Sequence, residues 1–276
     1  MKLLEPTVNS MLEPLNSQAS NDGLTDPCHA WVCREETFTH RAQTQGPLSE
    51  ITVGVKDIIV TKDFPTQFGT TLPASAFAEL LGIGDASAVA MLREAGAKIV
   101  GKTVTTELAT FKPGPTLNPW RHERTPGGSS SGSAAAIATG DVSLALATQT
   151  AGSIGRPAAF CGVLGLKPSF DRLKTEGVLM TSKTLDTLGL MAQSVDTLRR
   201  SMVVLGNLNS PVQSAASTQT LVFYKGHLWS TLTSEDQLVI QDFVKKIAPY
   251  FRSVSHKKPR QCLANLTKAQ QYIHSH

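Results

Sequence analysis

The sequence predicts an α/β protein in which helices and strands alternate to build a β-sheet. Strand-like and helix-like segments alternate along the middle of the chain, which is the order expected for such a sheet. Hydrophobic residues make up 41% of the 276 residues and charged residues 17%, which is ordinary for a globular protein with a buried core. The length exceeds that of an average domain, but α/β folds of this size often form a single unit.

The alternation starts with a strand, a helix and a second strand. Alternating apolar residues over 51–55 predict a strand that ends just before Lys56. Asp85 is expected to cap a helix that Gly96 ends, and a short strand is expected over 98–100. The helix carries three apolar positions on one face, which are Val89, Leu92 and Ala95.

The middle of the chain is rich in glycine, serine and alanine. Residues 124–133 predict a polar loop, and the small residues 134–138 predict a helix that Gly140 closes. A buried strand is expected over 143–148, followed by a second glycine-bearing turn over 150–157. Small side chains allow such a helix to pack closely against its neighbours.

Three further elements are expected towards the C-terminus. Ser194 predicts the cap of a helix with apolar residues on one face, and residues 220–224 predict a strand. Ser234 and Gln237 form a capping-box pattern before a last helix. The apolar positions of these two helices are Val195, Leu198, Met202 and Leu205, and then Leu238, Phe243, Val244 and Ile247.

Composition excludes several classes of function. The net charge is only +4 and 6% of residues are aromatic, so a nucleic-acid groove is not expected. No run approaches membrane-spanning length, and no signal peptide is recognised. The cysteines form no CxxC pair and have no histidine cluster beside them, so we expect no metal and a reducing, cytoplasmic setting. They are Cys28, Cys33, Cys161 and Cys262.

Residues 96–103 match the phosphate-loop pattern GxxxxGK[ST] letter for letter. That pattern requires a strand before it and a helix after it, so that backbone N–H groups face the phosphates. Here the predicted order is reversed, because a helix ends at Gly96 and strand-like residues follow. We interpret the match as a coincidence.

Residues 151–155 resemble a relaxed nucleophile elbow, GxSxG with alanine in place of its first glycine, and Ser153 is its serine. A serine hydrolase of that type also needs an acid and a histidine downstream. None of the available residues lies in a distinctive motif; they are Asp171, Asp186, Asp196, His227 and His256. By itself the segment is equally compatible with an ordinary glycine-bearing turn.

Three segments together are more specific. Residues 54–57, 126–133 and 150–158 occur in this order, and Ser129 precedes Ser153 by 24 residues (153 − 129 = 24). They resemble the three motif segments of the amidase signature family. Supporting matches lie at residues 101–103, 107–109 and 161–168, and the resemblance runs from about Gly46 to Leu198.

The resemblance implies a role for each matching residue. Lys56 takes the place of the family's catalytic lysine, Ser129 that of a bridging serine after a cis peptide bond, and Ser153 that of the nucleophile. Ser130 matches a hydroxyl that supports the lysine. Arg156 lies where members acting on malonamate-like substrates carry an arginine for the substrate carboxylate. The oxyanion turn corresponds to the N–H groups of Thr150, Ala151, Gly152 and Ser153.

Each assignment has a structural alternative. Lys56 can act as a base near neutral pH only if burial lowers its pKa from about 10.4, and it could instead pair with Asp57 at a strand end. Ser129 and Ser153 could be loop hydroxyls that cap helices. Arg156 could anchor a loop.

The resemblance also implies the domain organisation. Residues 47–206 are expected to form the amidase signature core, with a poorly defined segment over 1–46 and a partial strand-helix region of the same domain over 207–276. Family members continue for roughly a hundred residues or more, so the family's mixed β-sheet, flanked by helices, is expected to be incomplete at its C-terminal end. Gln149 lies where many relatives carry an acidic residue, and Gly155 replaces a bulkier one.

The function implied by the resemblance is hydrolysis of a small or medium carboxamide through a seryl acyl-enzyme, without a cofactor. The expected partner is a small-molecule amide, with no nucleic acid and no membrane, and a homodimer is left open. Three alternatives remain. The chain could be a truncated non-catalytic homologue, a subunit that releases ammonia from glutamine for a transamidation partner, or a Ser–His–Asp esterase that depends on His227 or His256.

Overall fold

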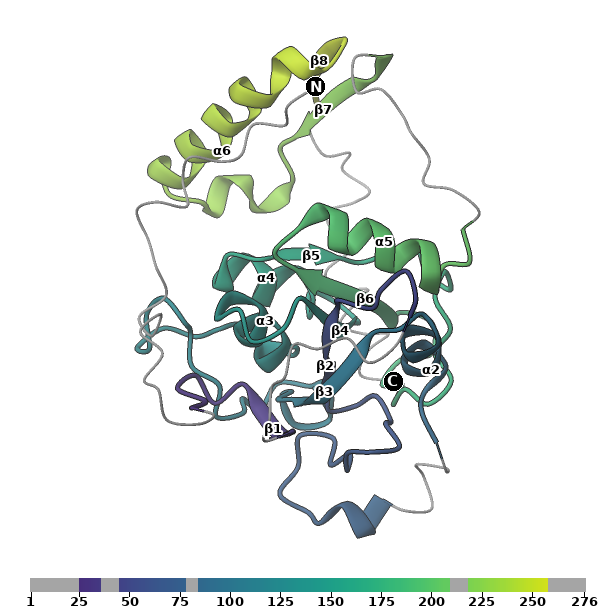
Figure 1. Ribbon diagram of the computed structural model, residues 1–276. Coiled ribbons are helices and arrows are strands. Elements are labelled where there is room, and N and C mark those ends of the chain that lie inside the picture. Colours follow the sequence, from purple (N-terminus) through teal and green to yellow (C-terminus); the bar gives the residue numbers. More distant parts are fainter. Residues whose placement is uncertain (1–24, 36–44, 78–83, 209–217, 258–276) are drawn as a thin grey trace. The chain divides into compact units, whose positions relative to one another are not determined.

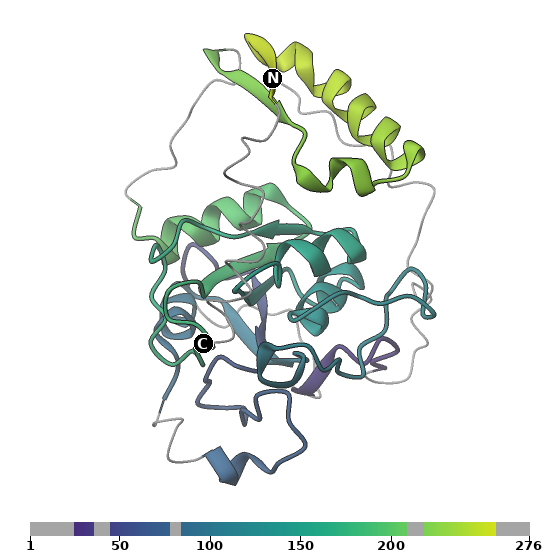
Figure 2. The same ribbon diagram turned by 180° about the vertical axis from the view of Figure 1, so that it is seen from behind.

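The computed structural model describes residues 25–35, 45–77, 84–208 and 218–257 (Figures 1 and 2). The chain separates into two compact units, Met1–Asn209 and Ser210–His276. The motif segments of the sequence all lie in the first unit.

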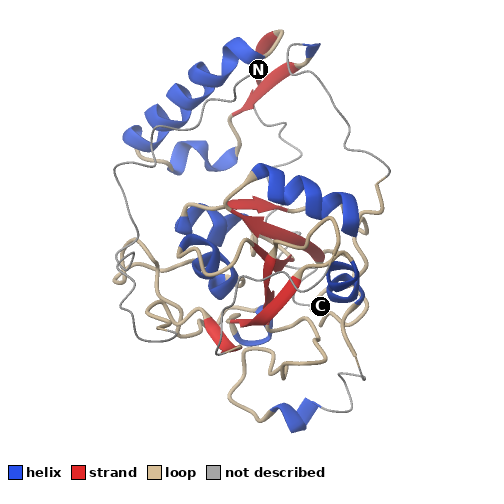
Figure 3. Ribbon diagram, viewed as in Figure 1, coloured by secondary structure: helices blue, strands red, loops and turns tan. Residues whose placement is uncertain are grey.

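The first unit is built on a β-sheet with helices around it (Figure 3). The sheet is mixed and has six strands in the order β1-β3-β2-β4-β6-β5. β2 pairs in parallel with both β3 and β4, and every other pair is antiparallel. This arrangement confirms the predicted mixed α/β fold, and the sheet is not closed. The strands are β1 Trp31–Arg34, β2 Thr52–Lys56, β3 Lys98–Thr103, β4 Leu144–Gln149, β5 Leu164–Leu166 and β6 Thr187–Ala192.

Helices cover both faces of this sheet (Figure 1). One core joins α2 and α5 to the side chains of Val53, Val55, Leu144 and Leu146. The other joins α3 and α4 to the opposite side of the same strands. The α-helices are α2 Ser87–Glu94, α3 Ser131–Ala138, α4 Gly155–Cys161 and α5 Val195–Leu205, and single 3₁₀ turns lie at Ala74–Phe77 and Glu107–Ala109.

Helix α3 is buried along its whole length and consists of small residues apart from Ile137. It begins at Ser131, three residues before the predicted start, because the predicted polar loop contributes its first turn. The buried hydroxyl of Ser133 is paired with Thr103 Oγ1 at 2.8 Å and with the Leu146 carbonyl at 3.2 Å. Paired serines can therefore occupy a helix that packs directly on the sheet.

One of the two predicted caps in this unit is correct. Ser194 caps α5, and its Oγ accepts from the N–H groups two and three residues ahead at 3.1 and 3.4 Å. Asp85 does not cap α2, whose N-cap is Ala86 without a side-chain hydrogen bond. Asp85 instead accepts from the Lys62 N–H at 2.8 Å and pairs with Arg93 at 2.8 Å, so tertiary partners take its carboxylate.

Residues 1–46 were expected to form a poorly defined segment, but Trp31–Arg34 form the strand β1 at an edge of the sheet. Trp31 Nε1 donates to Asp141 at 2.8 Å, and Arg34 pairs with the same carboxylate at 3.3 Å. These partners are more than a hundred residues away, so no local pattern announces the strand. Residues 1–24 and 36–44 lie outside the described part of the chain.

The second unit is a β-α-β arrangement in which β7 and β8 pair in parallel. β7 has the predicted bounds, but the predicted capping box is wrong. The N-cap is Thr233, whose Oγ1 accepts from the Asp236 N–H at 3.1 Å. Gln237 donates instead to the carbonyls of Trp229 and Leu232. The elements are β7 Thr220–Tyr224, a 3₁₀ helix His227–Thr231, α6 Ser234–Ile247, a 3₁₀ turn Ala248–Tyr250 and β8 Ser253–Lys257.

The close packing of α3 predicts the effect of adding one methyl group. A Cβ at Gly132 would lie 2.2 Å from the Ala30 carbonyl oxygen and 2.4 Å from the Val104 nitrogen. We expect Gly132→Ala to lower the free energy of unfolding by about 1–3 kcal/mol in denaturant titrations. The matched control is Gly155→Ala, whose new Cβ would meet only Gln149 Oε1 at 3.9 Å and should change stability by less than about 0.5 kcal/mol. Equal effects of the two substitutions would contradict this account.

Candidate active site

Lys56 is the last residue of β2, and its side chain is completely buried. Its Nζ lies 2.7 Å from Ser129 Oγ and 2.8 Å from Thr148 Oγ1, within hydrogen-bond distance of both. The alternative in which Lys56 pairs with Asp57 is not found. The Asp57 carboxylate instead faces the buried Lys102, with 3.7 Å between Oδ1 and Nζ.

Burial changes the acid-base properties of Lys56. An ammonium group out of contact with water loses its hydration, and this desolvation lowers the pKa of Lys56 to about 7. The negative charge of Asp186 acts in the opposite direction but does not outweigh burial. A large fraction of Lys56 is therefore a neutral amine near pH 7, as general-base chemistry requires.

The Ser129 hydroxyl is brought to Lys56 by a tightly held segment. The Gly128–Ser129 peptide bond is cis, as the family resemblance implied. The Ser129 carbonyl accepts from the Thr106 N–H at 3.1 Å. The Gly128 carbonyl accepts from Nε and Nη2 of Arg156 at 3.0 and 2.7 Å. The carbonyl groups of both residues joined by the cis bond are thus anchored to other parts of the unit.

Ser153 lies on the turn between β4 and α4, and its side chain is mostly buried. Its carbonyl accepts from the Ser130 N–H at 3.4 Å, so the two serine-bearing segments are in contact. Within the described residues, no hydrogen bond joins Ser153 Oγ to Ser129 Oγ. The structure therefore contains the link from Lys56 to Ser129, and the link from Ser129 to Ser153 is not formed.

The turn carrying Ser153 presents unused backbone donors. The N–H groups of residues 151–153 donate no hydrogen bond to any residue that the structure describes. The next two N–H groups, of Ile154 and Gly155, are both taken by Gln149 Oε1, at 2.9 and 3.0 Å. Such free N–H groups beside a serine hydroxyl can stabilise a negatively charged oxygen.

The other two predicted residues have more specific contacts than the sequence indicated. Ser130 Oγ donates to the Thr148 carbonyl at 3.3 Å, so it contacts the neighbour of Lys56 and makes no hydrogen bond to Lys56 itself. Arg156 is exposed and donates to the Gly128 carbonyl. It therefore anchors a loop, which was the structural alternative for this residue. Contact between Arg156 and a substrate stays a prediction.

Sequence reasoning missed two residues of this site. Thr148 was expected only as the end of a buried strand, and Asp186 only as one of several acids for another type of hydrolase. Thr148 has no sequence signal of its own, because its role depends on how β4 lies beside β2. Asp186 accepts a hydrogen bond from the Thr150 hydroxyl. Its negative charge also opposes the lowering of the Lys56 pKa by burial.

The phosphate-loop interpretation was correctly rejected, because residues 96–103 follow helix α2, which ends at Glu94, and contain the strand β3. Lys102, the lysine of that pattern, is buried and donates to the Ile59 carbonyl at 2.5 Å and to Thr66 Oγ1 at 2.6 Å. Burial lowers the pKa of Lys102 to about 8, and the Asp57 carboxylate opposes the shift. The Lys102 amine therefore makes its contacts with groups inside the protein.

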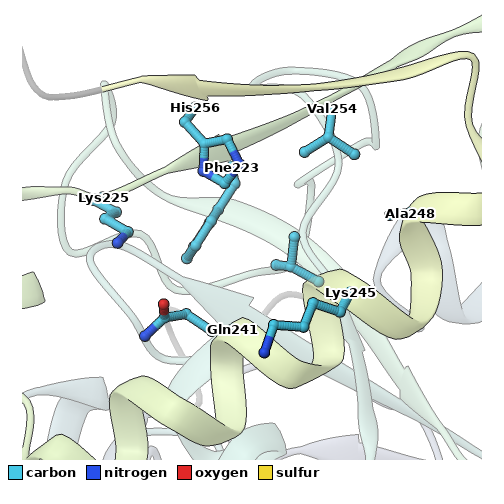
Figure 4. A pocket seen from close by; sticks show the side chains of 8 residues that line it. Phe223, Lys225, Gln241, Lys245, Ala248, Val254 and His256 are labelled. Carbon is cyan, nitrogen blue, oxygen red and sulfur yellow. The ribbon is translucent and has the colours of Figure 1, made fainter.

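The second unit contains a separate pocket of about 280 Å³ between its helix and strands (Figure 4). None of the predicted site residues lines it. The described residues contain no cluster of three or more metal-ligating side chains and no helix long and apolar enough to cross a membrane. The lining residues are Phe223, Lys225, Gln241, Val244, Lys245, Ala248, Val254 and His256.

The comparison with protein families agrees with this geometry. A family model described as Amidase matches residues 31–226, which is more than half of the chain. The chain belongs to the amidase signature family. A relative from Methanospirillum hungatei, a subunit of glutamyl-tRNA(Gln) amidotransferase, is 42% identical over 193 residues, covering 67% of this chain and 43% of the relative. The chloroplastic/mitochondrial counterpart from Oryza sativa is 34% identical over 242 residues, covering 83% and 41%.

Solved amidase structures share the fold of this family member. A crystal structure of an amidase has a TM-score of 0.71 and 31% identity, covering 84% of this chain and 53% of that one. The native peptide amidase from Stenotrophomonas maltophilia has a TM-score of 0.69 and 27% identity, covering 82% and 51%. The chain spans less than half the length of the two curated relatives.

The buried amine predicts a pH dependence of stability. Between the pKa of about 7 in the folded state and about 10.4 in the unfolded chain, only the unfolded chain binds a proton at Lys56. Stability from this group therefore rises with pH across that window, by up to about 1.4 kcal/mol per pH unit. We expect the free energy of unfolding of the wild type to increase relative to that of Lys56→Met as the pH rises from 7 to 10, measured in denaturant titrations.

The control for this measurement is Lys112→Met, because the side chain of Lys112 is 71% exposed. Its stability difference from the wild type should stay constant over the same pH range. A constant difference for Lys56→Met as well would mean that the folded protein keeps Lys56 protonated.

Proposed function

We propose that this amidase family member is an amide hydrolase that forms an acyl-enzyme on Ser153. The observation that carries the proposal is the buried Lys56 amine, 2.7 Å from Ser129 Oγ and with its pKa lowered to about 7. The free N–H groups of residues 151–153 beside the nucleophile support it further. No cofactor is required for this chemistry.

In the proposed mechanism, neutral Lys56 removes a proton from Ser129 while Ser129 removes one from Ser153. The Ser153 oxygen attacks the amide carbon, and the carbonyl oxygen, now negatively charged, is bound by the free N–H groups of the turn. The relay then runs in reverse and delivers the proton to the departing amine. Water attacks the acyl-enzyme along the same path and releases the acid.

The mechanism requires Ser153 Oγ and Ser129 Oγ to share a hydrogen bond when substrate is bound. Catalytic hydrogen bonds are often long in the absence of substrate and tighten in the complex. The contact between the Ser130 N–H and the Ser153 carbonyl already brings the two segments together.

The first test uses Ser153→Ala against a panel of small and medium carboxamides. We expect hydrolysis by the wild type and a loss of turnover by at least about 10⁴-fold in the variant, because the nucleophile is removed. Ser49→Ala is the matched control and should keep full turnover, since among the described residues that hydroxyl is hydrogen-bonded to Glu50 alone. A fluorophosphonate probe should label Ser153. Labelling of another residue would contradict the assignment of Ser153 as nucleophile, and a folded chain that the probe does not label would favour the non-catalytic alternative.

The second candidate substrate is the side-chain amide of glutamine. The names of the relatives favour it, since both are glutamyl-tRNA(Gln) amidotransferase subunits. In that case the purified chain should release ammonia from glutamine, in a reaction lost with Ser153→Ala, and should copurify with a larger tRNA-binding subunit. Turnover of simple carboxamides with no release of ammonia from glutamine, measured by coupled ammonia assay, would contradict this candidate.

A further inference from the structure

The Asp186 carboxylate is a buried junction between the nucleophile turn and a neighbouring loop. It lies directly before β6 and is only 7% exposed. Its oxygens accept from the Thr150 hydroxyl, from the N–H and hydroxyl of Thr181, and from the Ser182 N–H at 2.9 Å. The Thr150 and Thr181 hydroxyl oxygens are 3.3 Å apart. One carboxylate thus ties together three chain segments.

The pairing of two strands determines this position. In the antiparallel ladder of β4 and β6, Gln149 lies opposite Thr187. The next residue along β4 and the preceding residue along β6 are Thr150 and Asp186, so they are neighbours where the ladder ends. Thr150 also begins the turn whose next three N–H groups are unused. The carboxylate therefore holds the turn at the point where it leaves the sheet.

The same carboxylate acts electrostatically on the base. Asp186 is the charged group that raises the pKa of Lys56 against the effect of burial. Three other charged groups of this unit have partners other than Asp186 and Lys56. Asp57 and Lys102 face each other, and the Arg156 guanidinium is bound to the Gly128 carbonyl.

We propose that Asp186 is a positioning residue of the acyl-transfer site, acting through the Thr150 hydroxyl on the oxyanion turn and through its charge on Lys56. This inference rests on the proposed function. It assigns two separable effects to one carboxylate. The hydrogen bond to Thr150 fixes where the free N–H groups point, and the negative charge favours the protonated form of Lys56.

The test measures how fast a fluorophosphonate probe labels Ser153 between pH 5 and 10. In this reaction Ser153 Oγ forms a bond to phosphorus, fluoride leaves, and the serine proton passes into the relay. Thr150→Val removes the hydroxyl donor but keeps the charge of Asp186. It should slow labelling at saturating probe by about tenfold or more, since loss of an oxyanion donor itself costs about 10²–10³-fold. The pH at which labelling rises should not change, and Thr150→Ser should restore the rate.

Asp186→Asn removes the negative charge and replaces one acceptor oxygen by an NH₂ group, which can only donate. Labelling should slow, and its rise with pH should move to lower pH, because loss of the negative charge makes protonated Lys56 less stable. The matched control Asp196→Asn alters an exposed carboxylate paired with Arg199 and should leave both rate and pH profile unchanged.

Two contrary outcomes are distinguishable. If the wild type labels at Ser153 while Thr150→Val and Asp186→Asn keep its rate and pH profile, the role of Asp186 is wrong and the proposed function stands. If the folded wild type is not labelled at Ser153, the proposed function fails and this inference fails with it. Should Asp186→Asn not fold, as judged by its thermal unfolding, the comparison of Thr150→Val with Thr150→Ser decides the matter. In that comparison, equal labelling rates contradict the proposal.

Discussion

The burial of the Lys56 amine is the constraint on which the rest of the site depends. A charged ammonium at this position would lose its hydration, and the protein places two hydroxyls, of Ser129 and Thr148, rather than a carboxylate against it. Desolvation therefore dominates over the attraction of Asp186, and the pKa falls to about 7. A base available near neutral pH follows from the surroundings of the lysine and not from its own chemistry.

Lys102 shows what the same burial does beside a carboxylate. It lies next to β2 on strand β3, in register with Val55, and its amine faces Asp57 and the Ile59 carbonyl. Burial lowers the pKa of Lys102 as well, to about 8, and the Asp57 carboxylate opposes that shift by stabilising the charged form. Neighbouring residues of a strand point to opposite faces, so the sheet separates this ion pair from the Lys56 amine. On one face the lysine thus holds a loop, and on the other the lysine amine meets only hydroxyl groups.

Local patterns predicted those parts of the fold that depend on nearby residues. The apolar run that became β2 and the small residues of α3 were recognised because burial demands such residues wherever the segment packs. The strand β1 at Trp31–Arg34 was missed, since Asp141 and β3, which hold it, are distant in sequence. The caps at Asp85 and Ser234 were wrongly predicted for a related reason. Several side chains near a helix start can cap it, and tertiary contacts decide which one does.

For the site, the sequence by itself singled out Lys56, Ser129 and Ser153 as candidate catalytic residues. Glycine- and serine-rich segments at fixed spacing are specific enough to be recognised without a structure. Only the tertiary structure decided that Lys56 is buried against Ser129, and that Thr148 and Asp186 belong to the same site. These features arise at the edge of the sheet where β2 and β4 end and β6 begins. A pKa or a hydrogen bond depends on which groups lie close together in space, and a linear pattern does not specify their positions.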